Sequence, residues 1–170
     1  MNISFGDLIL GSFKDQLCLC DWRYRKMRSS IDKRIQKGLD AHYIEEESSV
    51  IRATRAQLSE YLNADRKVFD IPIQMVGTEF QKSVWNELLN IPFGKTESYQ
   101  GLSEKLSSRK AIRAVATANG ANAISILIPC HRVIGTKGEL VGYAGGLNVK
   151  SKLLELEKNE KVPEQMQLFE

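Results

Sequence analysis

The sequence predicts an α+β fold in which a small sheet-and-helix unit precedes a mostly helical unit. Two short alternating apolar runs at 7–13 and 16–22 are typical of paired strands. Helical periodicity appears at 50–62 and dominates beyond residue 78. With 170 residues and 42% hydrophobic content, the chain can form one large domain or two small domains that share an interface.

The first half, residues 1–76, is expected to be a supporting α/β domain. Lys14 and Asp15 form the predicted turn between its two strands. The apolar stripe of the following helix consists of Ile51, Leu58, Tyr61 and Leu62. A further strand is expected at 69–73, where Pro72 favours the edge of a sheet.

Cysteine usage and the N-terminal composition indicate the compartment. Three cysteines in a chain of this length favour a reducing environment over a disulfide framework. No secretory signal is expected, so we predict a cytoplasmic, nucleoid-associated protein. Cys18 and Cys20 share one strand face, but the chain has only two histidines, His42 and His131, and no Cys-x-x-Cys motif. Two small core residues are therefore favoured, and no metal site is expected.

The second half, residues 77–160, begins with a strong helix-start signal. Thr78 and Gln81 have the spacing of a capping box. The apolar side of the helix is predicted to consist of Phe80, Val84, Trp85, Leu88 and Ile91. The sequence Pro92-Phe-Gly94 is expected to end it.

Two short helices follow, joined by a tight turn, which is typical of a helix-turn-helix. Ser98 can cap the first, and Ser107 or Ser108 can cap the second, at 109–119. The second helix carries small residues and one long polar side chain, that of Arg113. It suits sequence-independent contact with a minor groove, but packing against a neighbouring helix explains it equally well.

The net charge of the chain is compatible with DNA binding but does not by itself indicate it. Net charge is only +3, and residues 78–150 contain nine basic and five acidic residues. Such an excess suits phosphate contacts as well as an ordinary solvated surface.

A reactive cysteine is suggested by the segment 126–134, in which apolar runs flank Pro129, Cys130 and His131. A cysteine reacts as its thiolate and needs a base or a positive field. Adjacent side chains on an extended segment point to opposite faces, so a relay through water is expected between the two residues. A Cys-His pair also arises by chance.

The sequence Pro129-Cys-His-Arg-Val133 resembles the active-site signature of the O6-alkylguanine-DNA alkyltransferases. Further segments resemble the family in order and spacing: 80–85, 93–94, 98–102, 113–115, Asn122 and 142–147. The resemblance is close over 78–157. In the first half of the chain it is limited to length and strand pattern. It implies an RNase H-like first domain, a winged-helix-like second domain, a flexible tail at 161–170, and no cofactor.

The resemblance also assigns catalytic roles. Cys130 is the alkyl acceptor, His131 deprotonates it through a water, and Glu157 holds that histidine. Asn122 ties the helix-turn-helix to the active-site loop. Tyr99 crowds the target phosphate and protonates guanine as O6 leaves.

Contacts with DNA are implied in the same way, and Arg113 fills the space of the extruded nucleotide. The expected DNA-binding residues are Tyr99, Arg113, Ala114, Thr117 and Arg132. The groups implied to read the flipped base lie at Val133, Tyr143 and Ala144. Many members have serine where Ala144 stands, so a hydroxyl contact would be missing in this chain.

The implied activity is repair of duplex DNA by a monomer that takes an alkyl group from O6 of guanine, or O4 of thymine, after base flipping. The product is a thioether with no route back, so each molecule acts once. A cysteine hydrolase and a sequence-specific regulator are the competing classes. A hydrolase would also need an oxyanion hole, and a regulator would need no chemistry.

The tail contains Gln165-Met-Gln-Leu-Phe169, which resembles the short peptides that bind the bacterial replication sliding clamp. Its glutamine would anchor by hydrogen bonds, while Leu168 and Phe169 would fill an apolar pocket. Alternatively, these two side chains fold back onto the protein.

Overall fold

The computed structural model of the chain describes residues 1–106 and 112–158, and it opens with an antiparallel sheet. The strands are β1 (Asn2–Ile3), β2 (Gly6–Phe13) and β3 (Gln16–Trp22), in the order β1-β2-β3. Lys14 and Asp15 join β2 to β3 with φ angles of 46° and 59°. Two successive left-handed residues match the twist of the strands that they connect, so the predicted hairpin and its turn are confirmed.

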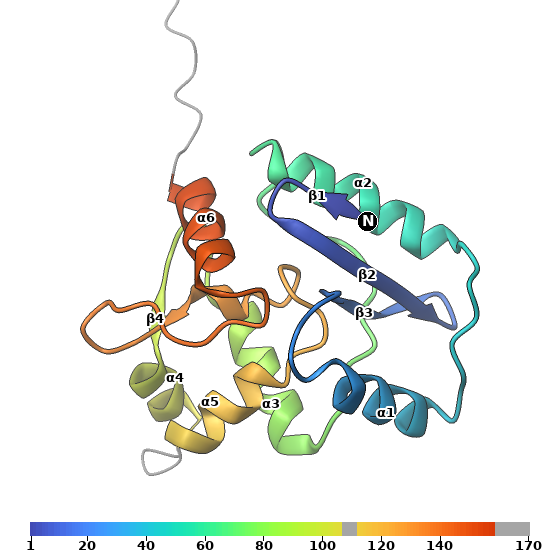
Figure 1. Cartoon of the computed structure of the whole chain (residues 1–170). Helices are drawn as coiled ribbons and strands as arrows, with labels where there is room; N and C mark the ends of the chain where they lie inside the picture. The colour runs from blue at the N-terminus through green and yellow to red at the C-terminus, as the bar shows by residue number, and fades with distance from the viewer. Residues whose placement is uncertain (107–111, 159–170) are drawn as a thin grey trace, which may run out of the picture.

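Two helices cover opposite sides of this hairpin (Figure 1). α2 (Ser49–Leu62) confirms the predicted helix and packs Leu58 and Tyr61 into the main core. α1 (Arg28–Leu39) was not predicted, because only Ile31 and Ile35 are buried in an otherwise polar stretch.

The expected strand at 69–73 is wrong. Only one bridge forms there, parallel to β3, between Ile73 and Leu17. Leu17 donates from its backbone to the carbonyl of Pro72 at 2.8 Å, and Gln74 donates to the carbonyl of Leu17 at 2.9 Å. Pro72 has no N–H to donate to a neighbouring strand. The segment therefore pairs with the edge of the sheet over this short stretch only and does not form a strand.

Helices dominate the second half, at α3 (Glu79–Leu89), α4 (Tyr99–Lys105), α5 (Ile112–Gly120) and α6 (Leu147–Lys158). The capping box of Thr78 and Gln81 is confirmed, as is the cap of α4, where Ser98 Oγ accepts from the backbone of Gly101. Phe80 is 39% exposed, contrary to prediction, because the buried face of α3 starts only at Val84. Residues 107 and 108, the expected cap of the next helix, lie outside the described residues.

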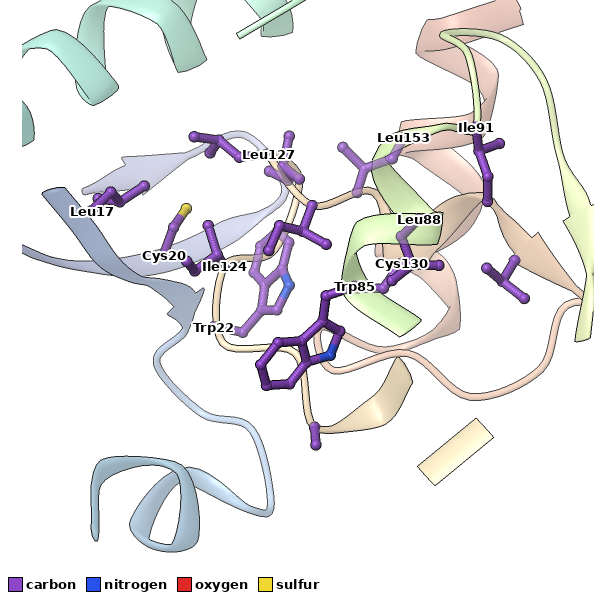
Figure 2. Packing of buried hydrophobic residues seen from close by; sticks show 14 of the residues in the cluster. Leu17, Cys20, Trp22, Trp85, Leu88, Ile91, Ile124, Leu127, Cys130 and Leu153 are labelled. Atoms are coloured by element: carbon purple, nitrogen blue, oxygen red, sulfur yellow. The ribbon is translucent and has the colours of Figure 1, made fainter. Parts of the chain in front are cut away.

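One hydrophobic core joins the two halves (Figure 2). It contains Leu17 and Cys20 of β3 together with Trp85 and Leu88 of α3 and Leu153 of α6. The boundary near residue 76 is therefore not a boundary between separate cores. Within the described residues, none of the helices combines the length and apolar character that a membrane span requires.

The segment that carries Cys130 is not extended as expected. Ile126 has a φ of 73°, and Cys130–Arg132 form a single 3-10 turn, η2. The strand β5 (Val133–Ile134) then pairs in parallel with β4 (Glu97–Ser98). Because α4 begins directly after β4, this pairing places Tyr99 beside the turn.

Candidate functional site

Cys130 lies at the start of η2, with 3% of its surface exposed, among the core side chains of both halves (Figure 2). Burial raises the pKa of its thiol, and the amide of Asn122 partly offsets this effect. The resting side chain is therefore a neutral thiol. A base is needed before it can act as a nucleophile.

Asn122 fixes the loop that leads to the cysteine. Its Nδ2 donates to the carbonyl of Ile128 at 2.9 Å, and its Oδ1 accepts from the backbone of Ile124 at 2.9 Å. The side chain is buried, so both bonds act in a medium where their loss would leave polar groups unsatisfied. These bonds hold the loop 122–128 just after α5, and the tie to the helix-turn-helix that the resemblance implies for Asn122 stays a prediction.

His131 and Glu157 form a fully buried pair. His131 Nε2 lies 2.8 Å from Glu157 Oε1, and η2 contacts α6 through this pair. The same carboxylate accepts from Arg132 Nε at 2.9 Å and from the backbone of Gly94 at 3.2 Å. Arg132 Nη2 donates to Oε1 at 3.0 Å, and the hydroxyl of Tyr61 adds a fifth hydrogen bond, 2.7 Å from the same oxygen.

These partners decide the protonation states. Burial alone would raise the pKa of Glu157, but the bonds and charges from His131 and Arg132 outweigh it and lower that pKa to about 2. The carboxylate is thus an acceptor, so His131 donates its Nε2–H to it. Burial lowers the pKa of His131, which leaves a neutral ring with its lone pair on Nδ1. Among the described residues Nδ1 has no hydrogen-bond partner, so it can serve as a base.

Arg132 does not lie where a DNA contact was expected. Its side chain is buried, and its Nε and Nη2 donate to Glu157 while Nη1 donates to the carbonyl of Ile91 at 2.6 Å. The guanidinium compensates the buried carboxylate, so it is withheld from the protein surface. The expectation that Arg132 binds DNA is therefore wrong.

Tyr99 stands at the first position of α4, half-buried, and accepts a hydrogen bond from Asn119 Nδ2 at 3.1 Å. Burial, followed by the nearby Cys130, raises the pKa of its hydroxyl to about 12. The phenol is thus protonated at neutral pH. It can donate a proton into the space near Cys130.

The segment after η2 holds Val133, Tyr143 and Ala144, the expected base-reading positions. Tyr143 and Ala144 are half-buried and pack against the core, and the Tyr143 hydroxyl accepts from Trp22 Nε1 at 3.3 Å. Its ring meets that of His131 edge-on, with centroids 6.3 Å apart. Lys150 holds this segment, because its buried Nζ donates to the carbonyls of Val133 and Val141 at 2.6 Å and 2.7 Å.

The helix α5 has one face in the core and one in solvent. Val115, Ala118 and Asn119 are buried, and Trp85 Nε1 donates to the carbonyl of Ala118 at 2.8 Å. The residues predicted to touch DNA, Arg113, Ala114 and Thr117, are all exposed. The buried face confirms packing against neighbouring helices, while contact of the exposed face with a minor groove stays a prediction.

The first half anchors the active-site loop through Arg25, which sequence reasoning missed. Arg25 Nη1 donates to Asp21 at 2.7 Å and to the carbonyl of Asn122 at 2.9 Å. Asp21 also accepts from Ser125 in the same loop, at 3.3 Å. Partners about a hundred residues apart leave no local pattern by which the sequence could have revealed them.

The chain is similar to known proteins in sequence and in fold. Residues 79–159 match the family model of the 6-O-methylguanine DNA methyltransferase DNA-binding domain. The chain is 46% identical over 114 residues to a methylated-DNA–protein-cysteine methyltransferase of Mycobacterium tuberculosis, covering 67% of this chain and 68% of that protein. An inducible enzyme of the same name from Bacillus subtilis is 41% identical over 123 residues, covering 72% and 69%.

Among solved structures, the fold matches the crystal structure of Mycobacterium tuberculosis OGT in complex with DNA. The TM-score is 0.81 at 35% sequence identity, over 93% of this chain and 90% of that one. The likeness therefore includes the first half of the chain, which the sequence motifs did not cover.

Proposed function

Because the chain belongs to the O6-methylguanine-DNA methyltransferase family, we propose that it repairs DNA by moving an alkyl group from O6 of guanine onto Sγ of Cys130. The observation that carries this proposal is the buried relay beside the thiol. His131 presents an unprotonated Nδ1 next to Cys130 in the chain, and its Nε2 is held by Glu157 at 2.8 Å. One copy holds every residue of this relay, so a monomer suffices.

The step begins with removal of the thiol proton. Among the described residues, His131 forms no direct hydrogen bond with Cys130, so a water between Sγ and Nδ1 carries the proton to the ring. The imidazolium is stabilised by the Glu157 carboxylate, as a buried charge must be. The burial that holds the thiol neutral at rest also leaves its thiolate poorly solvated, which favours attack.

The thiolate then displaces guanine from the alkyl carbon. The S–C bond forms, the C–O6 bond breaks, and the electron pair of that bond passes to the guanine. Tyr99 supplies a proton to the leaving base, and proton exchange with the imidazolium restores both side chains. The product is a thioether, which has neither an ionisable S–H nor an easy leaving step, so one molecule acts once.

Access to O6 requires the base to leave the stack. We propose that α4 and α5 act as a winged-helix-like helix-turn-helix, beside an RNase H-like first half, with α5 in the minor groove. The small exposed side chains of Ala114 and Thr117 allow close approach of the helix, and Arg113 projects from the same face to fill the vacated space. Val133, Tyr143 and Ala144 receive the flipped base.

Intact mass spectrometry tests the proposal. The protein is mixed with duplex DNA that carries O6-methylguanine, and a single adduct of about 14 Da is expected, one methyl in place of the thiol proton. Cys130→Ala should lose the adduct and still bind DNA. Absence of an adduct on reduced wild-type protein would reject the transfer and leave a regulator, while turnover without an adduct would point to a hydrolase. Duplex carrying O4-methylthymine extends the assay to thymine.

A second proposal concerns Gln165-Met-Gln-Leu-Phe169, which lies outside the described residues. We propose that this tail binds the bacterial sliding clamp, with Gln165 making hydrogen bonds and Leu168 and Phe169 filling an apolar pocket. Deleting residues 165–170 should abolish binding to immobilised clamp and leave alkyl transfer unchanged. Equal clamp binding by the truncated protein, or none by the intact chain, would contradict it.

A further inference from the structure

Among the residues that the structure describes, Tyr61 is the one donor to the Glu157 carboxylate from the first half of the chain. Its hydroxyl lies 2.7 Å from Oε1, the oxygen that also accepts from His131 Nε2. Tyr61 is fully buried, and its ring packs against Phe69 and Phe93 with centroids 5.4 Å and 6.1 Å away. A phenylalanine could provide the same ring packing, so the specific contribution of the tyrosine is the hydrogen bond that its hydroxyl donates.

We propose that Tyr61 is a positioning residue for alkyl transfer, which sets the basicity of His131 through the carboxylate that they share. This inference rests on the proposed function and extends the relay into the first half of the chain. Among the described residues, the Tyr61 hydroxyl bonds to Glu157 and forms no hydrogen bond with Cys130. It acts on the histidine through Glu157.

The direction of the effect follows from competition for one oxygen. A hydroxyl that donates to Oε1 disperses the negative charge of Glu157, which weakens the carboxylate as a partner for a protonated His131. Without that hydroxyl, Glu157 stabilises the imidazolium more strongly, and the pKa of His131 rises. More of the histidine is then protonated in mildly acidic solution and cannot accept the thiol proton.

Other charged or titratable groups also face this pair. Arg132 donates to both oxygens of Glu157, and Arg132 and Lys150 both lower the pKa of His131. Tyr143 meets the His131 ring edge-on, and Cys130 precedes it. Tyr61→Phe leaves all four in place, so a change in His131 reports on the one hydroxyl removed.

Kinetics provide the first test, with Tyr61→Phe compared with wild type. The second-order rate of transfer from a duplex containing O6-methylguanine is measured across pH. The acid limb of the profile should move to higher pH by about half a unit to one unit, while the plateau rate stays within about threefold of wild type. The matched control is Tyr43→Phe, which removes an exposed phenol that donates to Asp32 in the same half.

Nuclear magnetic resonance provides the second test and needs no DNA. The chain has two histidines, so the ring signals of His131 need to be distinguished only from those of the exposed His42. His131 should titrate at higher pH in Tyr61→Phe than in wild type. Coincident His131 titrations and coincident acid limbs would overturn the inference, even if the variant were less stable. Failure of wild type to transfer any alkyl group would instead contradict the proposed function.

Discussion

Nζ of Lys150 donates to the carbonyl oxygen of Val133, 2.6 Å away, from a side chain with no exposed surface. The same ammonium donates to the carbonyl of Val141, so α6 holds both ends of the segment between them. Burial lowers the pKa of Lys150 to about 8 and outweighs the opposite effect of Cys130. This lysine therefore closes the loop that follows η2 and places a positive charge near the thiol.

Lys150→Met is expected to loosen that loop. The substitution keeps the length of the side chain but leaves two carbonyls without their donor, at a cost of about 1–3 kcal/mol in the free energy of unfolding. Transfer should slow by about tenfold or more, because the groups that we propose receive the flipped base lose their fixed position. Urea unfolding and transfer kinetics measure both effects, with the exposed Lys152→Met as control. A variant that is destabilised yet transfers at the wild-type rate would contradict this role.

Acid should lower the free energy of unfolding by protonating Glu157. Its pKa is about 2 in the folded chain, against an ordinary value of 4.5, so the folded state binds the carboxylate's proton more weakly than the unfolded state. The stabilisation is fully present above about pH 4.5 and is lost as the pH falls towards about 2, amounting to about 3 kcal/mol. Glu157→Gln should flatten this part of the curve of unfolding free energy against pH. Parallel curves for the two proteins would contradict the assignment.

Local signals in the sequence were enough for the elements that depend on neighbours along the chain. Left-handed Lys14 and Asp15 end one strand and start the next, and Thr78 and Gln81 satisfy each other across one helical turn. The sequence did not predict the helix α1, because its two buried residues, Ile31 and Ile35, pack against β3 and Ala123. That stabilisation comes from tertiary contacts, so the local sequence pattern did not predict the helix.

The residues of the site also differ in how well the sequence predicted them. The resemblance around Cys130 implied a pairing of His131 with Glu157, and the structure brings these two residues together. Arg132 was misplaced, because a basic residue in a DNA-associated motif reads as a phosphate contact until its buried partner is known. Tyr61 was seen only as part of an apolar stripe. A buried tyrosine needs a hydrogen-bond partner, but which one depends on a contact 96 residues away.

Gly94 is expected to tolerate no side chain. It has a φ of 71°, and a Cβ there would lie 2.9 Å from the backbone oxygen of Glu157. Gly94→Ala should therefore lose about 1–2 kcal/mol from the left-handed backbone alone, and more from displacement of α6. Gly138→Ala is the matched control, because Gly138 has a φ of 83° but open space around its Cβ position. Thermal unfolding and transfer rates measure the difference, and equal effects of the two substitutions would contradict the contact.

Arg113 should matter for duplex DNA only. It projects from the exposed face of α5, where it can enter the stack and hold open the space that the flipped nucleotide leaves. Arg113→Ala is expected to slow transfer from duplex by roughly tenfold or more, since unstacking costs a few kcal/mol, and to leave transfer from a single strand nearly unchanged. The exposed Arg52→Ala, in α2, controls for loss of one positive charge. If Arg113→Ala slowed transfer equally on both substrates, its effect would lie in phosphate binding and the proposed insertion into the stack would be wrong.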